Sequence, residues 1–184
     1  MIQLDTSWLQ HVQKPARYTG GEYNSIVKDH STVDVTMALA FPDVYEVAMS
    51  HLGIKILYGL VNRRDDAAAE RVFAPWHDME EEMRKRNIPL FSLETRTPIK
   101  DFDVLAFTLQ YEMSFTNILN MLDLAGIPMY AKDRDMDFPL LVCGGPCAFN
   151  VEPIADFFDI VSLGESEEWG DEFIDLYKAE KAKG

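Results

Sequence analysis

Apolar residues in this chain occur in short runs that alternate with segments of helical periodicity. Residues 33–41 (VDVTMALAF) place larger apolar side chains at every second position, which predicts a strand with one heavily buried face. Residues 103–109 (DVLAFTL) form an almost continuous apolar run, as expected at the centre of a parallel sheet. Shorter runs predict further strands at residues 70–74, 89–93, 127–131, 138–143 and 158–163.

The segments between these strands carry helix signals. Residues 52–62 repeat leucine and isoleucine every four positions, which predicts an amphipathic helix. Residues 75–87 begin with acidic side chains and end with basic ones, an order that suits the helix dipole. Two more helices are predicted, at residues 114–126 with Ser114 as the N-cap, and at residues 165–181.

Alternation of strands and helices predicts an α/β fold with right-handed crossovers and a mostly parallel sheet. About six short strands favour an open, doubly wound sheet of the Rossmann or flavodoxin type over a barrel. Residues 1–32 are polar and irregular, which indicates an N-terminal arm, and residues 33–184 are expected to form one domain.

Two loops near the C-terminus are the best candidates for a ligand site. Residues 140–150 (LLVCGGPCAFN) and 159–168 (DIVSLGESEE) each run from an apolar strand through glycine into polar sequence. Ligands of doubly wound sheets bind at the carboxyl ends of the strands. Seven residues at these ends are therefore candidate contacts: Thr108, Gln110, Gly144, Gly145, Pro146, Gly164 and Glu165.

Each of these loops also has a plain structural interpretation. Two glycines let a backbone approach a flat ligand, but they equally make a tight turn between strand and loop. Glu165 or Ser166 is expected to cap the last helix, whose acidic first turn suits the dipole and argues against a bound phosphate.

Cysteine and histidine residues give little support for a metal site. Cys143 and Cys147 are the only cysteines, too few for a Cys₄ cluster, and buried free thiols are expected. The four histidines are scattered without paired ligand spacing. His51, just before the helix at 52–62, is either an axial metal ligand, a pocket donor or a capping residue; with Ser50 and Gly53 it joins the candidate cofactor contacts.

The bulk composition narrows the classes of partner. Seventeen basic against thirty-one acidic residues give a net charge of −14, which argues against direct binding to nucleic acid. No apolar run reaches the roughly 18–20 residues of a membrane helix, and the N-terminus lacks a signal-peptide pattern. Few cysteines and no targeting segment predict a cytoplasmic protein.

Six segments in order resemble the N-terminal domain of an uncharacterised family of cobalamin-binding-type radical S-adenosylmethionine (SAM) proteins. The resemblance covers roughly residues 14–168. Its segments are KPARYTGGEYN, ALAFPDVYEVAMSHLGIKILYGLVN, ERVFAPWHDMEEEM, FTLQYEMSFTNILNMLDLAGIP, CGGPCAFNVEPIADFFD and LGESEE. It implies a doubly wound, cobalamin-binding-like fold, with the glycine loops where the corrin would lie.

The chain departs from that class in two ways. In such enzymes the [4Fe–4S] cluster and SAM are bound by a barrel domain that carries a C-x3-C-x2-C motif. In this chain Cys143 and Cys147 have the first spacing of that motif, but Asn150 stands where the third cysteine would be. The chain alone is therefore not expected to be catalytic. The cobalamin ligand motif D-x-H-x-x-G would need aspartate at Met49 and glycine at Ile54, so cobalt ligation by His51 is not supported.

Three hypotheses follow. The first is a cobalamin-binding or vestigial cobalamin-type domain that serves a radical SAM barrel domain in the same chain or another. The second is an interaction module without cofactor, which docks onto that barrel or its substrate. The third is a flavodoxin-like domain that binds another small cofactor.

Overall fold

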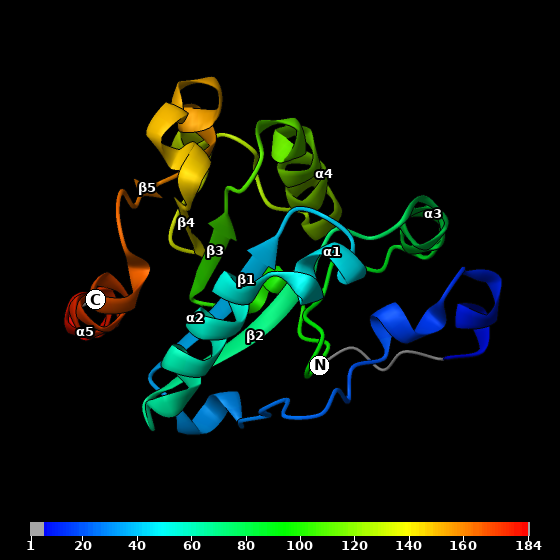
Figure 1. Cartoon of the computed structure of the whole chain (residues 1–184), viewed down its shortest axis with the longest axis horizontal. Helices are drawn as coiled ribbons and strands as arrows, with labels where there is room; N and C mark the ends of the chain where they lie inside the picture. The colour runs from blue at the N-terminus through cyan, green and yellow to red at the C-terminus, as the bar shows by residue number, and fades with distance from the viewer. Residues whose placement is uncertain (1–5, 184) are drawn as a thin grey trace.

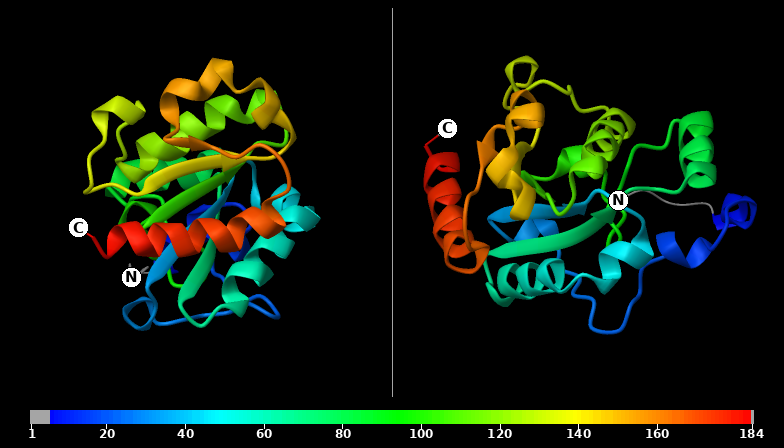
Figure 2. Two further views of the ribbon diagram at one scale, coloured as in Figure 1. Left: turned by 90° about the vertical axis from the view of Figure 1, so that its left-hand side faces the viewer. Right: turned by 45° about the horizontal axis from the view of Figure 1, so that its top comes forward.

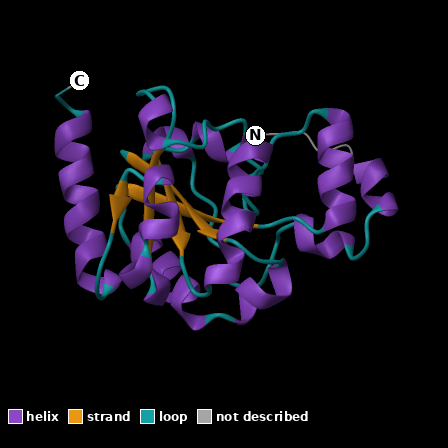
Figure 3. Cartoon of the chain, turned by 90° about the horizontal axis from the view of Figure 1, so that it is seen from above, coloured by secondary structure: helices purple, strands orange, loops and turns teal. Residues whose placement is uncertain are grey.

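Five parallel strands form the centre of the molecule. A computed structural model describes residues 6–183, apart from the side chains of residues 6 and 168. Within these residues the strand order is β2-β1-β3-β4-β5, and helices pack around the sheet (Figures 1 and 3). The predicted α/β class with a doubly wound parallel sheet is confirmed. The strands are β1 (Val35–Phe41), β2 (Ala67–Phe73), β3 (Val104–Thr108), β4 (Leu140–Gly144) and β5 (Ile160–Val161).

Helices cover both faces of the sheet. On one face, α2 and α5 pack over the strands, and α5 crosses in front of them in the left-hand view of Figure 2. On the other face, α3 and α4 contribute to a separate core with the turns that follow β4. A short helix, α1, precedes α2 directly. The helices are α1 (Tyr45–Ser50), α2 (Leu52–Arg63), α3 (His77–Arg86), α4 (Phe115–Ala125) and α5 (Ser166–Lys181).

The described part of the predicted arm packs on one side of this domain. Its 3-10 turns, Thr6–His11 and Pro15–Tyr18, lie near α3 (Figure 1). Trp8 is buried there, and the Arg86 guanidinium lies 5.6 Å from its ring centroid. The chain then passes to the start of β1, where Lys28 donates hydrogen bonds to the carbonyls of Arg64 and Ala67.

A buried polar network covers the free edge of β2. The carboxylate of Glu70 accepts hydrogen bonds from Ser92 Oγ at 2.5 Å and Thr95 Oγ1 at 2.8 Å, and lies 2.7 Å from His30 Nε2. The adjacent Arg71 forms a 2.6 Å ion pair with Glu94, whose side chain is fully buried. The edge of β2 is therefore closed by side chains and a loop rather than by another strand.

Several predicted elements differ from the observed ones. The predicted strand at 89–93 is a loop beside β2, bonded to it through Leu93 N and Arg71 O at 2.7 Å. The predicted strand at 127–131 is also a loop, because Ile127 N bonds Leu122 O and Gly126 takes a left-handed conformation to end α4. The strand predicted at 158–163 shortens to the two residues of β5.

Two predicted caps are absent as hydrogen bonds. Ser114 and Glu165 do occupy the N-cap positions of α4 and α5, but neither side chain bonds the helix backbone. The Ser114 hydroxyl instead donates to the Tyr111 carbonyl at 2.6 Å. No helix in residues 6–183 has the length and apolar character needed to cross a bilayer.

Candidate functional site

The strand order creates a crevice between β1 and β3. The chain leaves β1 toward the face that carries α2, and it leaves β3 toward the face that carries α4. Because consecutive loops diverge at such a switch point, the carboxyl edge of the sheet opens there. Ligands of doubly wound folds bind in this position.

A cavity of about 430 Å³ lies at this crevice. It runs between α2 and α5 and is bounded below by strands β1, β3 and β4. Sites for small molecules and cofactors are usually about 300–1,000 Å³. Nine of the ten predicted contacts line it: His51, Gly53, Thr108, Gln110, Gly144, Gly145, Pro146, Gly164 and Glu165. The tenth, Ser50, does not; its hydroxyl donates to the Val47 carbonyl at 2.7 Å.

Ion pairs at the opposite end of the two helices explain why the cavity opens at the carboxyl edge. Arg64, just after α2, pairs with Asp171 of α5 at 3.2 Å and also with Asp175. Lys178 of α5 pairs with Asp66 at 2.5 Å. These contacts hold α5 to α2 and the amino edge of the sheet, while the first turns of α5 stay free to form a cavity wall.

The double glycine has a structural role as well as a place in the cavity wall. Gly145 has a φ of 106°, and a Cβ there would lie 3.0 Å from both Leu109 O and Gln110 Nε2. Leu109 N also donates to Gly144 O at 2.6 Å. Gly145 is thus required by the turn, because it joins the ends of β3 and β4 closely. A Cβ on Gly144 would meet Ser162 only at an ordinary 3.6 Å.

His51 and Gly53 form one unit at the start of α2. A Cβ on Gly53 would lie 2.9 Å from His51 Cε1, so the glycine makes room for the imidazole. The ring also packs against Phe41, with centroids 5.3 Å apart. His51 Nδ1 is buried, and among the described residues it has no hydrogen-bond partner. The imidazole therefore holds one polar atom that a ligand or water can satisfy.

The walls of the cavity are mainly apolar, and sequence reasoning did not identify them. Helix α2 contributes Ile54, Leu57 and Val61, and α5 contributes Trp169 and Phe173. The two aromatic rings of α5 stack with centroids 4.6 Å apart and planes 20° apart. Helical apolar stripes of this kind usually pack into a core, so the sequence pattern does not distinguish a core contact from a ligand contact.

The charge around the cavity does not suit a phosphate anchor. No lysine or arginine is among its lining residues in the described part of the chain. Glu165 and Glu167 stand at the mouth and are exposed. Phosphate sites in α/β folds usually combine a helix N-terminus with backbone N–H groups and no opposing carboxylates. The first turn of α5 presents carboxylates instead.

Both cysteines are free and buried, as the sequence predicts. Burial raises the pKa of the Cys143 thiol to about 12, and burial with the nearby Glu112 raises that of Cys147. Such thiols are poor nucleophiles and poor metal ligands at neutral pH. Within residues 6–183, no three His, Cys, Asp or Glu side chains gather into a potential metal site.

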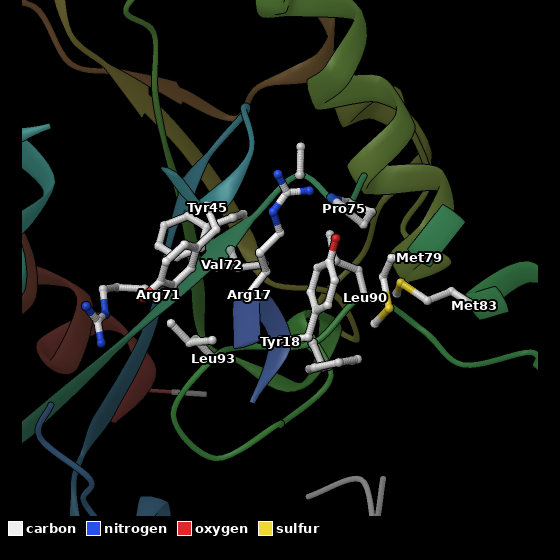
Figure 4. Close-up of a pocket in the computed structure, with 13 residues that line it drawn as sticks. Arg17, Tyr18, Tyr45, Arg71, Val72, Pro75, Met79, Met83, Leu90 and Leu93 are labelled. Carbon is white, nitrogen blue, oxygen red and sulfur yellow. The ribbon is translucent and has the colours of Figure 1, made fainter. Parts of the chain in front are cut away.

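A second hollow lies between the arm and β2. It has a volume of about 30 Å³, room for about one water molecule. Figure 4 shows Arg17 and Tyr18 of the arm beside Pro75, Met79 and Leu90. The Tyr18 hydroxyl accepts a hydrogen bond from Trp76 N at 3.1 Å. This hollow is a packing detail of the arm and is too small for a cofactor.

Comparisons with known proteins place the chain in a family. The family described as "Radical SAM proteins, N-terminal" matches residues 53–184, which include β2 to β5 and most of the cavity. An uncharacterized protein of Methanocaldococcus jannaschii, MJ0966, is 28% identical over 134 residues. That match covers 71% of this chain but 24% of the relative, so this chain spans about a quarter of the relative's length. The chain belongs to the family of N-terminal domains of radical SAM proteins.

Proposed function

We propose that this domain holds a cobalamin-type corrin over the carboxyl edge of its sheet, facing the catalytic barrel of a radical SAM protein. The observation that carries the proposal is the cavity between α2, α5 and the sheet, which opens at that edge and contains nine of the ten expected contacts. A bound corrin would supply cobalt-based redox or alkyl-transfer chemistry. The residues of this chain would bind and orient it.

The residues present are compatible with such a ligand. Gly144, Gly145 and Pro146 offer a surface with little side-chain bulk for the flat face of the ring. Thr108 and Gln110, which are hydrogen-bonded to each other, would contact its edge or its nucleotide tail. Gly164 and Glu165 would close the far side.

We do not propose His51 as a ligand of the corrin's cobalt. Ile54 stands where the cobalamin ligand motif has glycine, and its side chain lines the cavity beside the imidazole. His51 is instead assigned to hydrogen bonding with a polar group of the ligand, through the unpartnered Nδ1.

Hydroxocobalamin tests this proposal directly. The purified chain is mixed with it, desalted and examined by visible spectroscopy, with flavin mononucleotide in a parallel sample. We expect about one equivalent of corrin to stay with the protein. Flavin mononucleotide should be lost, because its terminal phosphate carries about two negative charges and would meet Glu165 and Glu167 without a basic partner, whereas the phosphodiester of cobalamin carries one. Loss of all corrin on desalting would overturn the proposal, and a retained yellow colour would favour the flavodoxin-like alternative.

The interaction module remains the second candidate, because exposed apolar side chains gather on the loops at the same edge. Met113 is 74% exposed, Phe149 76% and Leu163 62%. These follow strands β3, β4 and β5 respectively. Replacing Met113 and Leu163, which do not line the cavity, by serine should weaken binding to a separately purified radical SAM barrel domain while leaving corrin binding intact. Equal binding of the barrel by both forms would remove this surface from consideration.

A further inference from the structure

The cavity continues below its mouth as an apolar slot. Its floor is one face of the strands, because Val104, Ala106 and Val142 point to the side covered by α2 and α5. From Thr108 at the edge to Val104 at the start of β3, the slot is about 13 Å deep at the usual rise per strand residue. A polar group at this depth would lose its water without gaining a partner.

Gly170 lines this slot on the side of α5. It lies on the same face of α5 as Ser166 and Phe173, which also line the cavity. A Cβ built on Gly170 would meet no atom within 4 Å, and its backbone does not have a positive φ. Neither packing nor backbone conformation therefore requires glycine there, although glycine is a poor residue for a helix interior.

We infer that Gly170 sets which ligands this domain accepts, by leaving room for a neutral aromatic or aliphatic arm of the ligand between α5 and the sheet. The polar remainder of the ligand stays at the mouth, near Glu165 and Gln110. The inference rests on the proposed function, since it assigns the deep part of the same cavity. It restricts the ligand to an amphiphilic molecule with one uncharged arm.

Gly59 provides a matched control. It lies in α2, it is exposed, and a Cβ there also meets no atom within 4 Å. Gly59 does not line the cavity. Leucine at position 59 therefore extends into solvent, whereas leucine at position 170 extends into the slot.

Two probes test the inference on the whole chain. Indole, a neutral aromatic molecule, is titrated while amide chemical shifts are followed by NMR. We expect saturable shifts at Val104, Ala106 and Phe173 in the wild type and in Gly59→Leu. Binding by Gly170→Leu should be at least roughly tenfold weaker, since a filled slot loses most of the contact with the probe. No slot shifts in the wild type, or equal binding by Gly170→Leu, would overturn the inference.

Hydroxocobalamin retention is then measured for the same variants, which separates the two proposals. If the wild type and Gly59→Leu retain corrin and Gly170→Leu loses it, the result supports both the corrin proposal and the inference about the slot. If no variant retains corrin but the indole result holds, the corrin proposal fails and the slot stands. If Gly170→Leu retains corrin as well as the wild type, the slot is not used and the inference fails. Gly170→Val, whose side chain is smaller than leucine but extends beyond the Cβ, replaces Gly170→Leu if the larger side chain prevents folding.

Discussion

The two faces of the sheet are packed very differently. On the face of α3 and α4, Leu105, Met121 and Leu122 have no exposed surface, and the helices pack closely over the strands. On the face of α2 and α5, the same strands border a cavity of about 430 Å³. One face is thus a closed core, and the other leaves the space that we propose a ligand occupies.

Contacts at the amino edge of the sheet hold the two helices of the open face in place. The open face is held together at the amino edge by the ion pairs of Arg64 and Lys178 with aspartates. Ion pairs that stay partly open to solvent contribute little stability individually, so these pairs position α5 more than they stabilise it. Because the buried core on the closed face is the larger of the two, we expect that face to supply the larger share of the folding free energy.

The largest effect is expected from truncating the closed face. Leu122→Ala removes a fully buried side chain from α4 and should lower the free energy of unfolding by about 2–5 kcal/mol. Leu57→Ala, on the cavity wall of α2, should cost only about 1 kcal/mol, because that side chain already borders open space. Urea unfolding of the two variants measures the difference. Equal losses would mean that the two faces share the stabilising role.

Sequence reasoning located the mouth of the cavity because strand ends are local signals. Glycine and polar residues directly after an apolar run mark such an end, and parallel strands bring all their carboxyl ends to one edge. Thr108, Gly144 and Gly164 were identified in this way. The fold class alone predicts that these residues lie together at one edge, without knowledge of side-chain contacts.

The walls of the cavity and some secondary-structure elements depend on tertiary contacts, and the sequence pattern alone does not predict them. Phe173 and Leu57 have the spacing of core residues, and only the separation of α2 from α5 leaves them beside a cavity. Strand β2 starts at Ala67, earlier than predicted, because alanine has a low strand propensity and pairing with β1 decides the register. The short helix α1 gave no periodic signal within its 6 residues.

A second, smaller loss of stability is expected at the edge of the closed face, where Glu70 is buried. Burial acts to raise the pKa of this carboxyl, but hydrogen bonds from His30, Ser92 and Thr95 outweigh it and lower the pKa below its usual value. Glu70→Gln weakens these bonds and should cost about 1.5–3 kcal/mol at pH 7. Corrin binding should not change, because Glu70 is outside the cavity.

The pH dependence follows from the direction of that shift. A carboxyl with a lowered pKa in the folded state stabilises the protein fully above its unfolded pKa, about 4.3, and loses this contribution as pH falls toward the folded value. The gap in unfolding free energy between wild type and Glu70→Gln should therefore narrow below about pH 4.3. A gap that widens toward acid would mean that the pKa of Glu70 is higher in the folded state than in the unfolded state, which would contradict the lowered pKa.

The smallest effects are expected from adding single methyl groups on the open face. Gly59→Ala and Gly170→Ala should each raise the free energy of unfolding by about 0.5–1 kcal/mol, because alanine favours helix and neither Cβ meets an atom within 4 Å. Gly53→Ala should not show this increase in the free energy of unfolding. Its new methyl group would lie 2.9 Å from His51 Cε1 and should displace the His51 ring. Thermal unfolding of the three variants, with the NMR signals of the His51 ring, separates these cases. If Gly170→Ala destabilised the protein as Gly53→Ala does, α5 would lie closer to the sheet than this structure places it, and the open face would be as closed as the other.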